Sequence, residues 1–172
     1  EGVPFAEIPG EKLYDMVLPK NSKEEKVFIR LAVTFITLMK TNCKSISEIR
    51  NLANKTHDER SLFIIDNIIC PVYEKYVKCM ENSQQKDFTD IILEATKLCE
   101  KWQQSPYEYI IVDEFQDISM DRYRFLQALR KGEPKSKLFC VGDDWQSIYR
   151  FSGSDLSLFT DFESFFGHTD LK

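Results

Sequence analysis

Apolar residues recur every three or four positions along most of the first hundred or so residues, which is the spacing of amphipathic helices. The first such series follows Ser22 and continues to about Lys40, with charged and threonine side chains on its other side. Asp58 and Asp87 each precede a later apolar series and are suited to cap a helix, and Asp90 completes a capping-box-like arrangement with Asp87. We therefore predict helices over about 22–40, 47–55, 59–80 and 88–102.

Pro71 lies inside the third of these series. Proline has no backbone N–H, and its ring collides with the carbonyl group four residues earlier, so a proline forced into a helix interior costs about 3 kcal/mol. The sequence therefore predicts that this helix kinks or divides near Cys70.

The pattern changes after Pro106. Residues 109–112 (YIIV) and 137–141 (KLFCV) are short, β-rich runs of the kind found in strands buried on both faces. A helical stretch over about 121–130 separates them, and a strand, crossover helix and strand form the βαβ unit of a parallel sheet. Residues 159–166 are rich in aromatic side chains and are predicted to be helical.

Composition narrows the class of protein without identifying its function. Apolar residues make up 42% and aromatic residues 13% of the 172 residues, which supplies a packed core and excludes a disordered or collagen-like chain. The net charge of −5 gives no overall basic character that would indicate nucleic-acid binding, but it is compatible with a local basic groove. Five scattered cysteines without a C-x-x-C pair favour free thiols, and no apolar run is long enough for a membrane span. We therefore predict a cytoplasmic protein with no membrane partner.

An acidic turn follows each of the two predicted strands. Asp113 and Glu114 come directly after the first strand, while residues 142–144 (GDD) and Gln146 follow the second. Because the carboxyl ends of parallel strands meet at one edge of a sheet, where open α/β sheets bind ligands, we expect these residues to lie together.

Phosphoryl transfer requires a carboxylate that holds Mg²⁺ and a group that orients or deprotonates the attacking water. Asp113 is suited to the first role, Glu114 to the second, and Gln146 to a hydrogen bond with a nucleotide phosphate or the water. The alternative is that the acidic residues only cap the helix that follows.

A mixed aromatic and cationic segment comes directly after this acidic turn. Tyr149 and Phe151 flank Arg150, a combination suited to stacking on bases and contacting the backbone of a single strand. Core packing is the alternative explanation for these side chains. Trp145 is expected to pack near the turn without a chemical role.

Three segments of the chain resemble motifs of the UvrD/Rep-type superfamily 1 DNA helicases. The sequence of the third segment is similar to that of the helicase IV branch. Residues 87–93 (DFTDIIL) resemble the DFDDLL segment of that family, and residues 111–117 (IVDEFQD) resemble its Walker B segment. Residues 141–151 (VGDDWQSIYRF) resemble its GDxxQSIYxWRGA motif. The usual Trp-Arg-Gly is replaced by Phe151-Ser152-Gly153, which keeps a stacking ring and loses a cation.

The resemblance implies an α/β fold in which a partial P-loop NTPase (RecA-like) parallel sheet is preceded by a mostly helical subdomain. Residues 1–85 would form the insert-like helical subdomain, and residues 86–172 part of the RecA-like motor lobe. It also implies that Asp113 holds Mg²⁺, that Glu114 is the catalytic base for ATP hydrolysis, and that Gln146 binds and senses the γ-phosphate. The residues that would contact DNA are Tyr149, Arg150 and Phe151.

By the same resemblance, the chain would belong to an ATP-driven 3′-to-5′ DNA helicase or single-stranded DNA translocase. Its partners would be single-stranded or partially duplex DNA and the remaining motor lobe of the same polypeptide. The sequence begins with Glu1 rather than Met and contains no G-x-x-x-x-G-K-[ST] loop for a triphosphate, so we expect an internal segment that is inactive alone. Two alternatives remain open: a non-catalytic DNA-binding or adaptor module derived from a helicase, and the motor part of a helicase–nuclease.

Overall fold

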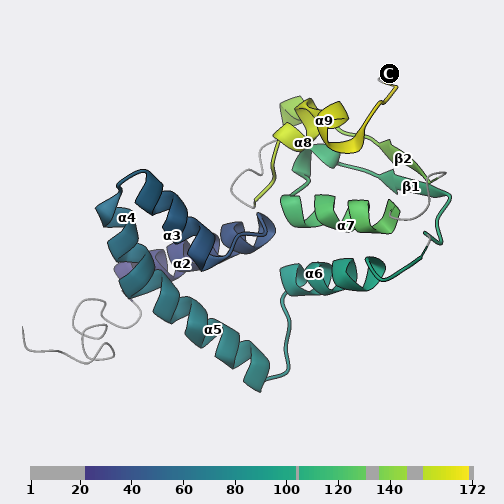
Figure 1. The fold of residues 1–172 in the computed structure, drawn as a ribbon. Coiled ribbons are helices and arrows are strands. Elements are labelled where there is room, and N and C mark those ends of the chain that lie inside the picture. Colours follow the sequence, from purple (N-terminus) through teal and green to yellow (C-terminus); the bar gives the residue numbers. More distant parts are fainter. Residues whose placement is uncertain (1–21, 104, 131–135, 147–152, 171–172) are drawn as a thin grey trace, which may run out of the picture.

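The structure, a computed structural model, describes residues 22–103, 105–130, 136–146 and 153–170 (Figure 1). Helices form the first part of the chain, and a pair of strands with its covering helices forms the second. In chain order the elements are α2 (Lys23–Thr41), α3 (Ile46–Lys55), α4 (Glu59–Ile64), a π-helical turn (Ile65–Ile69), α5 (Cys70–Asn82), α6 (Phe88–Cys99), β1 (Tyr109–Val112), a 3₁₀ turn (Phe115–Asp117), α7 (Met120–Arg130), β2 (Lys137–Cys140), a 3₁₀ turn (Asp144–Gln146), α8 (Ser157–Thr160) and α9 (Phe162–Phe166).

Side-chain caps fix where four of the helices begin, close to the predicted positions. Ser22 caps α2, and Ser45 forms a capping box with Glu48 at the start of α3. Asp58 caps α4 and Asp87 caps α6 by accepting the backbone N–H group three residues later. These local bonds explain why the helix starts are readable from the sequence.

Pro71 lies in the first turn of α5, directly after the π-helical turn that continues from α4. The turn before it is a π-helix over Ile65–Ile69, and Cys70 N–H bonds to the carbonyl of Ile65. The backbone at Ile65, Ile69 and Cys70 is right-handed helical, so the helix continues from α4 into α5, and the interruption predicted near Cys70 takes the form of a π-helical turn.

The two strands form a parallel pair in which Ile110 lies beside Leu138 and Ile111 beside Phe139. Helix α7 is the crossover between them, and α6 packs along α7 (Figure 1). The predicted βαβ unit is therefore present. Its core consists of five buried residues from the strand, the turn and the helices around them: Ile110, Phe115, Ile118, Leu126 and Leu158.

Phe115 anchors the 3₁₀ turn after β1 in this core. It is 1% exposed, and its ring packs edge-on against Phe162 and Phe166 of α9, with centroid separations of 5.4 and 5.7 Å. The aromatic C-terminal helices thus hold the end of β1 in place, which is where the candidate site lies.

The other face of the strand pair differs from the prediction of strands buried on both faces. Ile111 is 73% exposed and Phe139 60% exposed, and they form a registered pair that points away from the core. Among the described residues, the buried core that contains Ile110 also includes Leu126 of α7, so it lies on the opposite face of the pair.

A charged cluster joins the end of α2 to the start of α6. The Lys40 ammonium lies 2.6 Å from a carboxylate oxygen of Asp87 and 2.6 Å from one of Asp90, and the Tyr76 hydroxyl donates to Asp87. Lys40 is buried, so these bonds replace its hydration. The cluster fixes the helical segment against the segment that leads into the strand pair.

Candidate functional site

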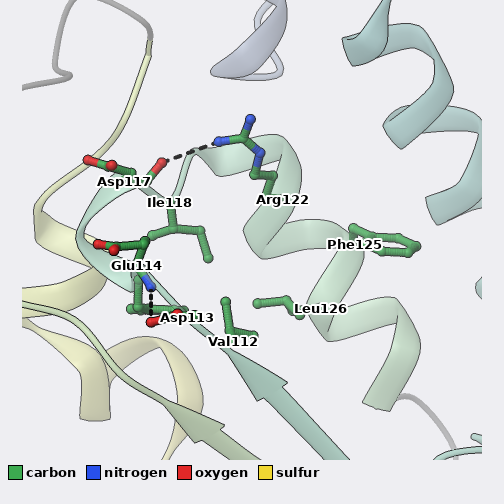
Figure 2. Close-up of a pocket in the computed structure, with 9 residues that line it drawn as sticks. Val112, Asp113, Glu114, Asp117, Ile118, Arg122, Phe125 and Leu126 are labelled. Carbon is green, nitrogen blue, oxygen red and sulfur yellow. Dashed lines mark hydrogen bonds between the residues drawn. The ribbon is translucent and has the colours of Figure 1, made fainter.

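Asp113 and Glu114 extend from the carboxyl end of β1, and both side chains are exposed. Glu114 adopts the left-handed conformation (φ 51°), and its backbone N–H donates to Asp113 Oδ1 at 2.8 Å. This conformation turns the chain sharply after the strand, so that the two neighbouring carboxylates project from the sheet edge (Figure 2). The site therefore begins at the place where open α/β sheets bind ligands.

The same edge receives the turn that follows β2. Val141 N–H bonds to the carbonyl of Val112 at 2.9 Å, and Phe115 N–H bonds to the carbonyl of Val141 at 2.8 Å. These bonds continue the parallel pairing beyond the strands and hold the two acidic turns side by side. The prediction that the two turns share one edge of the sheet is confirmed.

Gln116 connects the two turns through its side-chain amide. Its Nε2 donates to Glu114 Oε2 at 2.6 Å, and its Oε1 accepts the backbone N–H of Asp143 at 3.0 Å. The residue is 2% exposed, so the amide is shielded from water, while its partners Glu114 and Asp143 are exposed. Only this orientation of the amide satisfies both partners, because the carboxylate accepts and the N–H donates.

Gly142 allows this close contact. A Cβ atom at that position would lie 2.6 Å from Gln116 Oε1 and 2.9 Å from Phe159 Cε2, and both distances are shorter than normal contacts. Glycine is therefore the residue that lets the turn after β2 pack directly on the Gln116 amide.

Gln146 lies on the 3₁₀ turn after β2, and its Nε2 donates to Asp143 Oδ2 at 2.7 Å. The other carboxylate oxygen of Asp143 accepts the backbone N–H of Trp145 at 3.1 Å. Gln146 is thus connected to Glu114 by way of Asp143 and Gln116. Of the predicted residues that the structure describes, Asp113 and Glu114 lie at the turn after β1, and Gln146 lies on the neighbouring turn after β2.

A pocket of about 360 Å³ opens between the end of β1 and the first half of α7 (Figure 2). Asp113 and Glu114 lie at one end of it, and the Arg122 guanidinium donates to the Asp117 carbonyl at 3.3 Å along its wall. Gln146 does not line this pocket. The full lining is Val112, Asp113, Glu114, Phe115, Asp117, Ile118, Arg122, Phe125 and Leu126.

The carboxylates at this edge fit Mg²⁺ held mainly by a nucleotide. Among the described residues, no group of three or more histidine, cysteine, aspartate or glutamate side chains is arranged to hold a metal by itself. Mg²⁺ usually takes only one or two protein carboxylates and completes its shell with water and phosphate oxygens. The exposed Asp113 carboxylate supplies a donor of that kind.

Cys140 ends β2 close to the site but is unsuited to nucleophilic chemistry. Burial raises the pKa of its thiol to about 12, and the Arg130 charge offsets this only in part. The thiol therefore stays protonated at neutral pH.

Tyr149, Arg150 and Phe151, the predicted DNA contacts, lie outside the described residues. Trp145 differs from expectation, because its side chain is 93% exposed and does not pack near the turn. Gln116 is the residue that sequence reasoning missed. The signal that could have found it is an uncharged hydrogen-bonding side chain two residues after the candidate base, directly after a buried aromatic.

Comparison with known proteins agrees with this architecture. The chain is 38% identical over 149 residues to DNA helicase IV of Escherichia coli (strain K12), covering 84% of this chain and 22% of that protein. It is 40% identical over 99 residues to the putative ATP-dependent DNA helicase YjcD of Bacillus subtilis (strain 168), covering 54% of this chain and 13% of the relative. It is 35% identical over 104 residues to the ATP-dependent DNA helicase PcrA of the same organism, covering 57% of this chain and 14% of that protein.

The chain therefore spans less than a quarter of the length of these relatives. The described part of the chain contains no helix with the length and apolar character of a membrane span. Residues 10–167 match the UvrD/REP helicase N-terminal domain family, which confirms the predicted resemblance and the partial RecA-like fold class. This chain belongs to the UvrD/REP helicase N-terminal domain family.

Proposed function

We propose that this chain supplies part of the ATP site of an ATP-dependent DNA helicase. The observation that carries the proposal is the joining of the two acidic turns: Glu114 and Gln146 belong to different turns, and Asp143 and Gln116 connect them by hydrogen bonds. Helix caps alone would not require two separate turns to share a buried amide. The names of the relatives, which are DNA helicases, support the same function.

Each residue has a separate task in this proposal. Asp113 would hold the Mg²⁺ that accompanies ATP, and the ion would neutralise negative charge on the phosphates. Glu114 accepts a proton from the attacking water, since it is a carboxylate at the open edge of the sheet. Gln146 donates from its side-chain amide to the γ-phosphate and exchanges its bond with Asp143 for that contact.

DNA would bind beside the β2 turn. Tyr149 and Phe151 would stack on bases of a single strand, and Arg150 would contact its backbone. In the whole protein this lobe would close on a second motor lobe, and translocation would run 3′ to 5′ on single-stranded or partially duplex DNA in the cytoplasm. The sequence has no G-x-x-x-x-G-K-[ST] loop, so the chain alone would be inactive.

Substitution of Glu114 by glutamine in the whole protein tests this assignment. The amide keeps the size of the side chain but accepts no proton, so we expect ATP binding within about twofold of normal and turnover reduced at least about 100-fold. The measurements are fluorescent-nucleotide titration and single-stranded-DNA-stimulated phosphate release. Glu81→Gln, on the exposed surface of α5, is the matched control and should behave as the unmodified protein.

Two outcomes would contradict the proposal. Full turnover in the Glu114→Gln variant would exclude Glu114 as the base. DNA binding by the unmodified whole protein without any ATP hydrolysis would instead favour the non-catalytic adaptor.

A further inference from the structure

The side chain of Gln116 is placed to act on both acidic turns at once. It comes from the buried 3₁₀ turn after β1, and Phe115 on the same turn is fixed by the aromatic rings of α9. The backbone of Gln116 is therefore held by the core, while its amide reaches out between Glu114 and Asp143. A buried amide with one carboxylate and one N–H partner has a single satisfied orientation.

Glu114 has particular need of such support. Four non-glycine residues in the described part of the chain have positive φ angles: Cys43, His57, Gln84 and Glu114. The first three follow the ends of α2, α3 and α5, where backbone hydrogen bonds stabilise a left-handed residue. Glu114 follows a strand instead: its N–H donates to Asp113 Oδ1, its carbonyl accepts from Asp117 N–H, and its side chain is held by the Gln116 amide.

The contact on the other side is equally constrained. Asp143 bonds to Gln116 through its backbone N–H and to Gln146 through its carboxylate. Gly142 brings the turn so close that no larger residue fits without displacing the amide. A shift of the β2 turn therefore has to move the Gln116 side chain, which in turn bonds to Glu114.

We propose that Gln116 is a positioning residue that couples the turn bearing Gln146 to the orientation of the Glu114 carboxylate. This inference rests on the proposed function for the roles of Glu114 and Gln146. When Gln146 leaves Asp143 for a phosphate, the turn shifts, and the Gln116 amide carries that shift to Glu114. Glu114 is then aligned to act as the base only when Gln146 on the β2 turn is bonded to a phosphate.

Two substitutions separate the two halves of the coupling. Gln116→Met keeps the length of the side chain and removes both hydrogen bonds. Gln116→Glu keeps an oxygen acceptor for Asp143 N–H but sets a second carboxylate oxygen against Glu114, so it replaces the bond to the base by repulsion between like charges. Gln127→Met is the matched control, because Gln127 makes hydrogen bonds to Tyr123 and to the Phe165 carbonyl away from the strand ends.

The first readout is steady-state ATP hydrolysis by the whole protein with excess single-stranded DNA. We expect kcat to fall about 10- to 100-fold in Gln116→Met and in Gln116→Glu, since each loses the hydrogen bond from residue 116 to the Glu114 carboxylate. The KM for ATP should change less than about threefold, because the amide does not touch the nucleotide. Gln127→Met should retain the normal kcat.

The second readout is hydrogen exchange at the Asp143 amide, which does not depend on turnover. Exchange should become faster in Gln116→Met and stay slow in Gln116→Glu and Gln127→Met. Unchanged exchange in Gln116→Met would overturn the coupling. So would a normal kcat in either Gln116 variant, or an equal loss of kcat in Gln127→Met. If the unmodified protein does not hydrolyse ATP, the proposed function fails, and the exchange result alone decides whether Gln116 joins the turns.

Discussion

Lys40, Tyr76, Asp87 and Asp90 show how one buried cation organises several residues. Burial alone would lower the pKa of the Lys40 ammonium, but its bonds to the two carboxylates outweigh this and raise it. Burial also raises the pKa of the Tyr76 hydroxyl to about 12, and the bond that it donates to Asp87 adds to the rise. Lys40 and Tyr76 therefore both stay protonated across the neutral range.

Asp87→Asn tests this cluster through its pH dependence. Burial acts to raise the pKa of the Asp87 carboxyl, but bonds from Lys40, Tyr76 and the Asp90 backbone lower it from 3.8 to about 2. Because the folded pKa is the lower one, the stabilisation is present above pH 4 and is lost as the pH falls towards 2. At pH 7 we expect the variant to lose about 1–2 kcal/mol of unfolding free energy, since asparagine still caps α6.

Urea unfolding from pH 7 down to pH 3 measures this effect. The difference in unfolding free energy between the Asp87→Asn variant and the unmodified protein should become smaller below pH 4. The control is Asp66→Asn, which breaks a surface pair with Arg50 and should cost less. A difference that stays constant over this range would show that the Asp87 charge does not stabilise the fold.

At the scale of elements, the helices and strands follow from short-range patterns. The caps at Ser22, Ser45 and Asp58 each involve a residue three positions away, so the sequence alone predicts where these helices begin. The strand pair follows from two β-rich runs around a helix. Such features depend on neighbours along the chain.

Contacts between distant residues could not be predicted in the same way. Gln116 bonds to Asp143 across 27 positions, and Lys40 bonds to Asp87 across 47. The sequence around each side chain does not identify its partner, because the partners are set by how the elements pack. The exposure of Trp145 has the same origin, since it depends on what covers the turn.

Gly142→Ala tests the packing between the β2 turn and the 3₁₀ turn after β1. The added methyl group would lie 2.6 Å from Gln116 Oε1, so one of the turns must move. We expect a loss of about 1–3 kcal/mol in unfolding free energy and a reduced rate of ATP hydrolysis in the whole protein.

Gly167→Ala is the matched control, because the added carbon has open space and only the positive φ of 87° opposes it. It should lower stability by about 1 kcal/mol and leave hydrolysis unchanged. Equal rates in the Gly142→Ala variant and the unmodified protein would show that the close approach of the turns is not needed for turnover.

At the scale of the whole molecule, the strand pair is open on one side. Ile111 and Phe139 form a registered apolar pair, and both side chains are mostly exposed among the described residues. Parallel sheets are normally covered on both faces, because their crossover connections place helices there. The relatives are several times longer than this chain, so further segments are available in them to complete such a layer.

The double substitution of Ile111 and Phe139 by threonine distinguishes an open face from a covered one. In the 172-residue chain the two side chains are exposed. We therefore expect the double variant to self-associate less than the unmodified chain in sedimentation velocity, and to differ little from it in thermal stability. In the whole protein, a covering layer would bury both side chains, and the same change should lower unfolding free energy by more than about 2 kcal/mol. An equal, small effect in both proteins would mean that this face stays uncovered, and the expectation of a sheet buried on both sides would then be wrong.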